Sequence, residues 1–374
     1  MSPNKKLRVA VIFGGPSSER EVSLSSGHEV LKNLPRDKYE LQPVEIKENG
    51  QWILGEAKYL GRQKSSNQLA TFSPNKQPSL MSEFKNSVDV AFLALHGKFG
   101  EDGRIQSLLD ILGIPYTGSG VLASALGMDK LKTRLLLSRF GIQFPKLIKV
   151  DDKKFNLEKL NNLIEQKISY PCVVKPNQSG SSIGVSIIDS KKQLQKAIRS
   201  ASKEDSCVLI EEYIRGREMS CGVYGNTGQT QIKVLPVTEI IPKSSDRFFS
   251  YDAKYIPGRT REVCPAPISK KLTAEIQRLS KIAHVRLGCD GLTRSDFIIK
   301  ENKVYPHTKR GSSISSQTNS KNPRSGVGAY FLEINTIPGI TRTSICPTEA
   351  KVAGISFPKF LDLQIKLAIP RTKF

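Results

Sequence analysis

The sequence lacks any apolar run close to the roughly 18 residues that a helix needs to cross a membrane. Its N-terminal apolar segment contains Arg8 and ends at Gly14, which is typical of a first strand and not of a signal peptide. The six cysteines form no Cys-x-x-Cys pair and are scattered along the chain. We therefore expect free thiols rather than a disulfide framework, a cytoplasmic location and no membrane partner.

Acidic side chains are scarce: 35 stand against 57 basic ones, which gives a net charge of +22. Such a field attracts anionic ligands and permits loose contact with nucleic acid. A nucleic-acid-binding surface normally clusters basic residues with aromatic ones. Here the basic residues are spread along the chain, and the densest segment, 303–324, contains only Tyr305 as an aromatic residue. We expect a solvated basic surface and no specific nucleic-acid partner.

The chain also lacks a P-loop, because no Gly-Lys-Ser/Thr sequence opens a helix. Instead, Lys175 follows an apolar run and precedes a small-residue loop, 177–184, which is rich in hydroxyl groups and backbone N–H donors. A second strand is expected over 185–188. Strand, glycine-serine loop and strand together indicate a hairpin that covers phosphate groups. An ordinary glycine turn is the alternative.

What the chain does contain is the segment FLEINTIPGITRTS, at residues 331–344. Glu333 and Asn335 are two residues apart in an expected strand, so both side chains lie on one face. Two hard oxygen ligands there suit Mg²⁺, which leaves its other positions to water and phosphate. Asp296 supplies a third carboxylate at the start of another strand. An exposed strand end before a proline turn is the alternative.

The N-terminal part has the pattern of an open parallel sheet. The sequence predicts strands over 7–13 and 39–46, with a helix over 19–34 between them. Another apolar strand, 88–95, ends at His96, where parallel sheets collect their ligands. A structural histidine that holds the following glycine loop is at least as good an interpretation as a catalytic one. Residues 50–86 are expected to form an irregular, loop-like elaboration.

The remaining chain is expected to alternate helices and strands. Helices are predicted over 104–112, 121–140, 193–200, 276–287 and 348–367, and strands over 208–214, 219–224, 232–237 and 291–299. Two segments are unusual. The polar aromatic segment 248–258 is suited to closing over a site. Residues 302–329 form an acid-free insert, expected to be disordered or mobile, where a tight hairpin would otherwise stand.

Seven motifs carry a resemblance over nearly the whole chain: GGPSSEREVSLSSG, HGKFGEDG, YTGSGVLASALGMDK, VVKPNQSGSSIGVS, IEEYIRGREMS, YDAKY and LEINTIPGITRTS. In this order they resemble the D-alanine:D-alanine ligases of the ATP-grasp superfamily. The resemblance implies an α/β and α+β ATP-grasp fold. Its three domains would be a Rossmann-like domain over 1–125, a central lid over 126–222, and a catalytic domain over 223–374 that contains the basic insert 302–329.

Position by position, the resemblance implies roles for individual residues. The nucleotide would be bound by Lys130, Lys175, Ser182, Glu211, Glu212, Ile214 and Glu218. Two Mg²⁺ or Mn²⁺ ions would be held by Asp296, Glu333 and Asn335. The first D-alanine would be bound by Glu19 with Ser181 and Tyr255, which tie the loop shut, and with His96 nearby. The developing oxyanion would face Arg294 and the Gly339 N–H, the second substrate would meet Ser344, and the transferred phosphate would lie near Lys254.

The implied reaction is the ATP-dependent ligation of two D-alanine molecules through an acyl phosphate, for peptidoglycan precursor synthesis, by a homodimer. Two alternatives stay open. A related ligase would make D-alanyl-D-lactate or D-alanyl-D-serine, although Tyr255 points to an amine as the second substrate. The second alternative is a relative that has lost catalysis and binds nucleic acid through its basic surface. Such a protein would not need to keep Glu19, Arg294 and the three metal ligands together.

Overall fold

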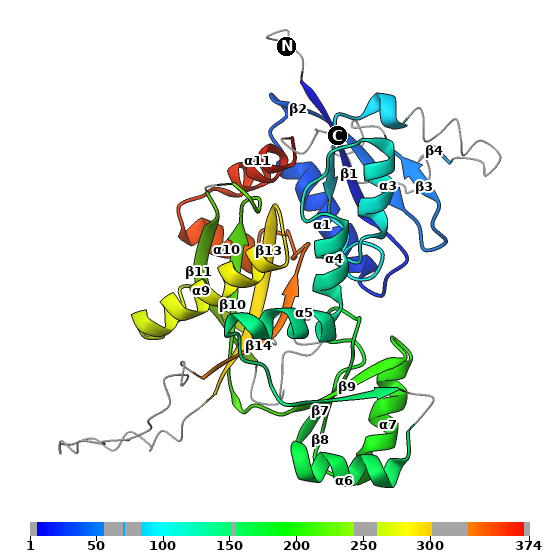
Figure 1. Ribbon diagram of the computed structural model, residues 1–374. Coiled ribbons are helices and arrows are strands. Elements are labelled where there is room, and N and C mark those ends of the chain that lie inside the picture. Colours follow the sequence, from blue (N-terminus) through cyan, green and yellow to red (C-terminus); the bar gives the residue numbers. More distant parts are fainter. Residues whose placement is uncertain are drawn as a thin grey trace.

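The computed structural model describes residues 6–55, 70–71, 84–151, 155–229, 231–242, 260–300 and 328–369. These residues fold around three β-sheets, at the upper right, the left and the lower right of Figure 1. Within the described part of the chain, no helix is both long and apolar enough to pass through a membrane.

Three strands of the first sheet are parallel, as the sequence predicts, and two antiparallel strands extend it. Its strand order is β4-β3-β2-β1-β5, and β1 pairs in parallel with both β2 and β5. The strands are β1 (Leu7–Gly14), β2 (Tyr39–Ile46), β3 (Trp52–Leu54), β4 (Ala70–Thr71) and β5 (Val90–Leu93). Helix α1 (Arg20–Asn33) connects β1 to β2, and α3 (Arg104–Leu112) follows β5.

The prediction of an irregular segment over 50–86 is wrong for its described strands. β3 pairs antiparallel with β2, and β4 pairs antiparallel with β3. Trp52 and Ile53 are buried, and the Trp52 ring lies 5.6 Å from the Phe84 ring, centroid to centroid. Residues 52–54 bury these apolar side chains by pairing with β2, because the edge of the sheet offers both a hydrogen-bonding partner and an apolar surface. The sheet therefore extends beyond β2.

The second sheet is formed by the central part of the chain. Its four antiparallel strands have the order β6-β9-β7-β8. They are β6 (Leu147–Asp151), β7 (Cys172–Pro176), β8 (Ser186–Ile188) and β9 (Cys207–Glu212). Helices α6 (Leu157–Lys167) and α7 (Lys191–Ser202) share one apolar core with these strands. β7 and β8 form the predicted hairpin, so the loop 177–185 projects from one end of this sheet.

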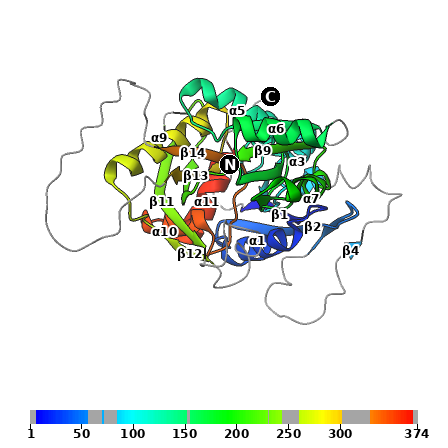
Figure 2. The same ribbon diagram turned by 90° about the horizontal axis from the view of Figure 1, so that it is seen from below.

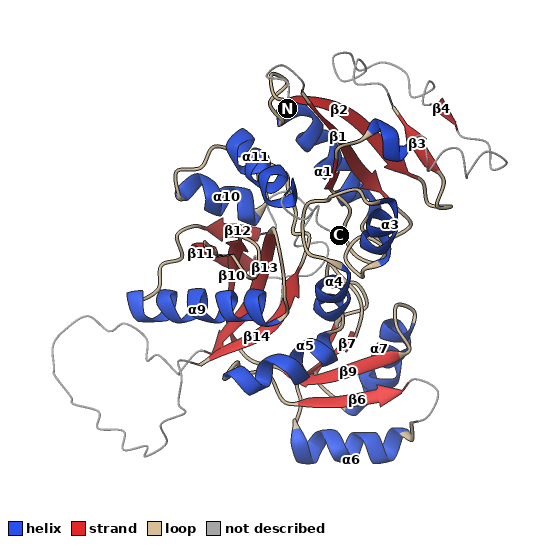
Figure 3. Cartoon of the chain, turned by 45° about the horizontal axis from the view of Figure 1, so that its top comes forward, coloured by secondary structure: helices blue, strands red, loops and turns tan. Residues whose placement is uncertain are grey.

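The third sheet is fully antiparallel, with the order β12-β11-β10-β13-β14. Its strands are β10 (Gly216–Tyr224), β11 (Lys233–Pro242), β12 (Thr260–Val263), β13 (Leu292–Lys300) and β14 (Ala329–Asn335). Helices α9 (Lys270–Arg286) and α10 (Ile345–Val352) pack against this sheet, as Figure 3 shows. The predicted metal ligands therefore stand on two neighbouring strands, β13 and β14.

The sequence predicts one helix over 121–140, but the chain forms two. α4 (Val121–Met128) and α5 (Lys130–Leu137) are separated by Asp129, whose backbone is extended (φ −86°, ψ 95°), and a 3₁₀ turn, Ser138–Phe140, follows. The Asp129 side chain accepts a hydrogen bond from the Lys132 N–H and so caps α5. The break puts Lys130 at the first position of a new helix.

The predicted helix over 348–367 is also two helices. α10 ends at Val352, and α11 (Phe357–Ala368) begins after Gly354, whose φ of +79° suits glycine. α11 returns to the first sheet and lies beside α1 in both Figure 1 and Figure 2. Its residue Asp362 accepts a hydrogen bond from the Tyr39 hydroxyl (2.8 Å). The end of the chain therefore packs on its beginning.

Candidate active site

A pocket of about 360 Å³ lies between the second and third sheets. Its lining includes all seven residues that the resemblance assigns to the nucleotide: Lys130, Lys175, Ser182, Glu211, Glu212, Ile214 and Glu218. Apolar side chains complete its walls, among them Val173, Ile187, Ile298 and Leu332, and Asp296 and Glu333 stand at its polar end. Apolar walls with a few convergent charged groups suit a flat heterocycle that carries a charged chain.

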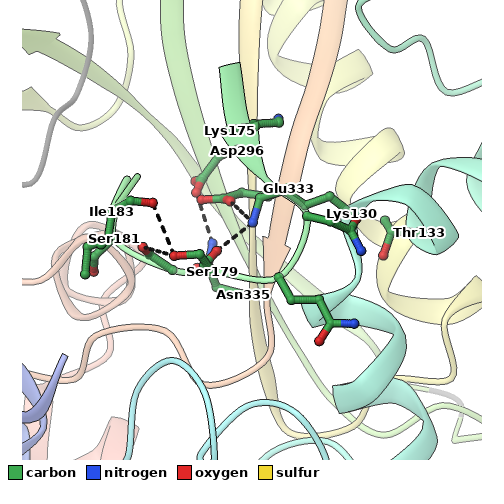
Figure 4. Close-up of polar contacts among 12 residues, drawn as sticks. Lys130, Thr133, Lys175, Ser179, Ser181, Ile183, Asp296, Glu333 and Asn335 are labelled. Carbon is green, nitrogen blue, oxygen red and sulfur yellow. Dashed lines mark hydrogen bonds and ion pairs between the residues drawn. The ribbon is translucent and has the colours of Figure 1, made fainter. Parts of the chain in front are cut away.

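Lys130 stands at the polar end of this pocket (Figure 4). Its Nζ donates a hydrogen bond to the Ser179 carbonyl oxygen (2.6 Å) and lies 3.3 Å from Glu333 Oε2. Ser179 belongs to the small-residue loop 177–184 of the hairpin formed by β7 and β8, which we name the lid loop and the lid hairpin after the implied central domain, and Glu333 is near the end of β14. The first residue of α5 thus brings a positive charge to the point where the lid loop meets the third sheet.

Lys175 and Glu211 form an ion pair on the lid side of the pocket. Lys175 Nζ lies 2.7 Å from Glu211 Oε2, and the two side chains are only 9% and 10% exposed. They come from the paired strands β7 and β9. Arg134 of α5 lies 4.0 Å from the other carboxylate oxygen and stacks over the Phe144 ring. Burial lowers the pKa of Arg134, and the Glu211 charge opposes that shift.

The three predicted metal ligands lie together on β13 and β14. In the antiparallel register, Asp296 stands opposite Glu333 and Arg294 stands opposite Asn335. The Asn335 amide donates to Asp296 Oδ2 (3.0 Å), and the Ser220 hydroxyl of β10 donates to Asp296 Oδ1 (2.6 Å). The side chains therefore converge as the metal hypothesis requires, while metal binding itself stays a prediction.

The chemistry of this donor set fits Mg²⁺. Among the residues that the structure describes, no three His, Cys, Asp or Glu side chains gather to form a metal cage. Two carboxylates and an amide instead suit a cation that binds few protein groups and takes its other oxygen ligands from phosphate and water. Lys130 lies beside Glu333 and Arg294 beside Asp296, so positive side chains already flank both acids.

Arg294 is paired with Asp296 through two hydrogen bonds, from Nε (3.0 Å) and from Nη2 (2.8 Å). Its side chain is 14% exposed. Burial opposes the positive charge, but the charge and hydrogen bonds of Asp296 outweigh burial and raise the pKa of Arg294 above its ordinary value. The guanidinium is therefore a fixed cation at the site.

Glu19, at the start of α1, reaches across to the lid loop. Its carboxylate accepts a hydrogen bond from the Ser181 hydroxyl, and both residues are buried. Two glycines leave room for this carboxylate, because a Cβ added to Gly97 or to Gly180 would overlap Glu19 Oε2. Glu19 thus lies in a slot between a loop of the first sheet and a loop of the second.

Both ring nitrogens of His96 have partners. Nδ1 lies 2.9 Å from the Ile337 carbonyl oxygen, and Nε2 lies 2.8 Å from the Ser26 hydroxyl. Because a carbonyl can only accept, Nδ1 carries the proton. Burial lowers the pKa of His96 to about 4, against the opposing effect of its bond to Ile337. These contacts favour a neutral, structural histidine, which is one of the two interpretations that the sequence left open.

Gly339 and Ser344 lie together after β14. A Cβ on Gly339 would stand 3.0 Å from Ser344 Oγ. Ser344 is the N-cap of α10, and its hydroxyl accepts from the Thr341 N–H (3.1 Å). A hydroxyl at a helix N-terminus is suited to a carboxylate ligand. The two other predicted catalytic residues, Lys254 and Tyr255, lie outside the described residues.

Family models cover most of the chain. The model described as D-ala D-ala ligase N-terminus matches residues 8–119, and the one described as D-ala D-ala ligase C-terminus matches 136–306 and 324–366. The chain belongs to the D-alanine–D-alanine ligase family. The resemblance that the seven motifs carried, and the mixed α/β fold it implied, are thereby confirmed.

Relatives of this ligase-family chain match it from end to end. D-alanine–D-alanine ligases from Syntrophobacter fumaroxidans and Halalkalibacterium halodurans are 36% and 34% identical to it over 98% of its length, and the matches cover 98% and 100% of those proteins. The solved VanG D-Ala:D-Ser ligase from Enterococcus faecalis is 32% identical, with a TM-score of 0.77 over 97% of this chain and 100% of that one.

The family match also locates the insert of this ligase-family chain. The C-terminal family model leaves residues 307–323 unmatched, inside the predicted insert 302–329. On either side, β13 and β14 stay paired to their ends, and the Lys300 N–H donates to the Gly328 carbonyl oxygen (2.9 Å). Residues 301–327 themselves lie outside the described residues.

Several side chains of the site escaped the sequence analysis. Glu101 is buried and accepts hydrogen bonds from two backbone N–H groups. Its position in the sequence, an acid inside a glycine-rich loop after a buried strand, could have indicated such a role. Arg134 stands four residues after Lys130, which puts both on one helix face. Ser220 had no signal, because a serine within an apolar strand is ordinary. Glu349 is fully buried behind β10, where burial raises its pKa well above the ordinary value.

Proposed function

We propose that this chain joins two D-alanine molecules to form D-alanyl-D-alanine, with ATP converted to ADP, as a step in making peptidoglycan precursors in the cytoplasm. The observation that carries this proposal is one juxtaposition. The pocket lined by the seven nucleotide residues ends at Asp296 and Glu333, with Arg294 beside them. Activation of a carboxylate by ATP requires a site for the phosphate donor, acids that can hold a metal ion and a cation that faces the reacting carboxylate. The pocket, the pair Asp296 and Glu333, and Arg294 would supply these in turn.

In this proposal the adenine and ribose of ATP lie against Glu211, Glu212, Ile214 and Glu218, and the phosphates lie toward Lys130, Lys175 and Ser182. The apolar walls of the pocket would take the ring, and the lysines would meet the anionic chain. The lid loop contributes backbone N–H groups and hydroxyls above the phosphates. ATP would therefore lie between the second and third sheets.

Asp296, Glu333 and Asn335 would hold two Mg²⁺ or Mn²⁺ ions. Such ions, when bound, reduce the repulsion between phosphate and carboxylate anions and orient the phosphate. The chain adds to this with its own cations: Lys130 lies beside Glu333 and Arg294 beside Asp296. These residues keep the acids in place at the end of the pocket.

The first D-alanine would be bound by its ammonium group at Glu19, and its carboxylate would take the phosphoryl group of ATP to form an acyl phosphate. The neutral amine of the second D-alanine, whose carboxylate lies near Ser344, would then attack that carbonyl carbon. Negative charge develops on the carbonyl oxygen as the amine attacks, and it is lost when the tetrahedral intermediate re-forms the carbonyl and expels phosphate. Arg294 and the Gly339 N–H would stabilise that charge, an effect for which one donor is worth about 3 kcal/mol.

Water must be kept from the acyl phosphate, since hydrolysis would waste ATP. The hydrogen bond from Ser181 to Glu19 closes the lid loop over the first-substrate slot. Lys254 and Tyr255 belong to this proposal through the resemblance: Tyr255 would complete the closure, and Lys254 would lie near the transferred phosphate.

The test is ADP release measured with each amino-acid enantiomer in turn, with the dipeptide identified by mass spectrometry. We expect ADP release with D-alanine, none above background with L-alanine, and a dependence on added Mg²⁺. Absence of D-alanine-dependent ADP release from folded protein would reject the proposal. If the same protein then bound RNA tightly and in a salt-sensitive way, the nucleic-acid-binding alternative would replace it.

A second candidate activity is the synthesis of D-alanyl-D-serine, and the similarity to the VanG D-Ala:D-Ser ligase favours it as the competitor. The chemistry before the second substrate is the same in both. An assay of D-alanine with an excess of D-serine, and separately of D-lactate, decides between them by the product formed. We expect D-alanyl-D-alanine to remain the main product at neutral pH.

We also propose that the chain forms a homodimer. Large apolar side chains are exposed on three successive helices: Ile111 of α3 (81%), Leu122 of α4 (71%) and Leu135 of α5 (62%). Single exposed apolar side chains are ordinary, so the proposal rests on the family resemblance, and these three side chains are the first place to look for the interface. Analytical ultracentrifugation should give twice the mass of the chain, and a monomer at micromolar concentration would reject this part of the proposal.

A further inference from the structure

The peptide groups of Ile337 are held on both sides by a loop of the first sheet. The Ile337 N–H donates to Glu101 Oε1 (2.7 Å), and the Ile337 carbonyl accepts from His96 Nδ1 (2.9 Å). The two partners precede Ile337 by 236 and 241 residues, and all three residues are buried. We call this set of three residues the Ile337 clamp. It ties the loop after β5 to the turn after β14.

The clamp is braced at both of its anchors. The second carboxylate oxygen of Glu101 accepts from the Gly97 N–H (3.0 Å), and His96 Nε2 lies against the Ser26 hydroxyl of α1 (2.8 Å). If Glu101 turned away, two buried backbone N–H groups would lose their acceptor, which is costly. The carboxylate therefore has one favourable position, and that position fixes Ile337.

Ile337 lies two residues before Gly339, the backbone donor assigned to the oxyanion. Pro338 stands between them, and its ring restricts φ to about −65°. Fixing the Ile337 peptide therefore limits where the Gly339 N–H can point. A hydrogen-bond donor of this kind acts only when it lies within hydrogen-bonding distance of the developing charge. A displacement of about 1 Å can reduce the rate by about a hundredfold.

We propose that Glu101 is a positioning residue for the ligation step, which acts through Ile337 to hold the Gly339 N–H at the developing oxyanion. This inference rests on the proposed ligase function. The same loop also carries Gly97, which packs against the Glu19 carboxylate. Glu101 thus fixes the position of the Gly339 N–H relative to the slot that holds Glu19. Glu101 itself touches no reacting atom in this scheme.

The test compares Glu101→Ala and Glu101→Gln with the control Asp102→Asn. Asp102 is an acid in the same loop that also accepts two backbone N–H groups, but they are those of Phe99 and Arg104, whereas the Ile337 N–H donates to Glu101. We expect Glu101→Ala to lower kcat about a hundredfold and Glu101→Gln about tenfold, because the glutamine NH2 group cannot accept the second N–H, whereas both oxygens of a carboxyl group can, with or without the proton. KM for ATP should change less than about twofold in both, and Asp102→Asn should keep wild-type kcat.

Hydrogen exchange of the segment 330–344 gives a second readout that needs no turnover. The Glu101 variants should exchange faster there than the wild type and Asp102→Asn. Unchanged kcat in a folded Glu101 variant, with or without faster exchange, overturns the proposal, as does an equal loss of kcat in Asp102→Asn. If Glu101→Ala does not fold, the volume-conserving Glu101→Gln decides. A wild type without D-alanine-dependent activity would reject the ligase function, and exchange would still report on the clamp.

Discussion

Arg294 donates two hydrogen bonds to Asp296, two residues further along the same strand, so the cation assigned to the oxyanion is held by an acid assigned to the metal. Asp296 also accepts from Ser220 and from Asn335, so a metal ion bound at this carboxylate would have to displace at least one of these donors. The position of Arg294 therefore depends on the same acid that orders the end of the pocket. Because Ser220 and Asn335 also donate to Asp296, this acid keeps two of its partners when Arg294 is removed.

Replacing Arg294 by alanine should lower kcat about a hundredfold or more and change KM for ATP only slightly, because the charge it stabilises appears only in the transition state. Steady-state kinetics with saturating D-alanine would measure both constants. Arg278→Ala is the control, since Arg278 pairs with Glu275 on the exposed side of α9 and is 52% exposed. An unchanged turnover number would remove Arg294 from the mechanism.

Glu19→Gln should raise KM for the first D-alanine roughly tenfold to a hundredfold, because a charged hydrogen bond to the ammonium is worth about 1.5–3 kcal/mol. KM for ATP should stay within about twofold of the wild-type value. Glu21→Gln provides a matched control on the same helix, where Glu21 is exposed. If only KM for ATP changed, the assignment of Glu19 to the ammonium group of the first D-alanine would be wrong.

Replacing residues 301–327 by Asn-Gly should leave catalysis intact. Lys300 and Gly328 are hydrogen-bonded at the ends of β13 and β14, and a two-residue Asn-Gly turn closes such an antiparallel pair. We expect kcat within about twofold of the wild type, because the strands that carry Asp296 and Glu333 keep their register. A folded but inactive variant would show that the insert takes part in the reaction.

The parts of the site that depend on local pattern could be predicted from the sequence. Period-two alternation predicts that Glu333 and Asn335 share one strand face, and the same rule applies to Arg294 and Asp296; the register confirms both placements. The lid hairpin was predictable because a small-residue loop separates two short apolar runs. In each case the residues that must cooperate are close in the chain.

Contacts between distant segments could not be predicted in this way. Glu101 meets Ile337 across 236 residues, and nothing in the local pattern of either segment indicates the other. The sequence does not predict the break between α4 and α5 by periodicity, because the apolar residues continue past it. The cap by Asp129 is a local signal, but the bond from Leu131 N–H to Asn177 depends on tertiary structure. Packing of α11 on the first sheet is of the same kind.

Gly180→Ala should reduce D-alanine-dependent activity at least tenfold in a protein that still folds. A methyl group at this position would overlap the Glu19 carboxylate, so either Glu19 or the lid loop must move out of place. Gly120→Ala is the control, because its nearest neighbour, the Tyr116 hydroxyl, would be 3.9 Å away. Circular dichroism would confirm folding. Equal activities of the two variants would contradict the proposal that the Glu19 carboxylate must lie against Gly180 for the enzyme to work.

The buried Glu101 should make the fold less stable as pH rises from about 4.5 to 8. Burial and the nearby Glu19 charge raise the pKa of Glu101 to about 8, against its two backbone hydrogen bonds and the Arg294 charge. Below about pH 4.5 the folded and unfolded chains both hold the proton; above it, only the folded chain does, so unfolding becomes easier until about pH 8.

This effect can be isolated with Glu101→Gln, which cannot ionise. The free energy of unfolding, measured in urea at pH 5.5 and 8.5, should fall more between these values in the wild type than in the variant, by an amount on the order of 2–3 kcal/mol. The pKa of His96, about 4, lies below this range, so His96 stays neutral throughout in the folded chain. Equal pH dependence in both proteins would mean that Glu101 is already ionised in the folded chain at pH 5.5, and that the N–H groups of Gly97 and Ile337 outweigh burial.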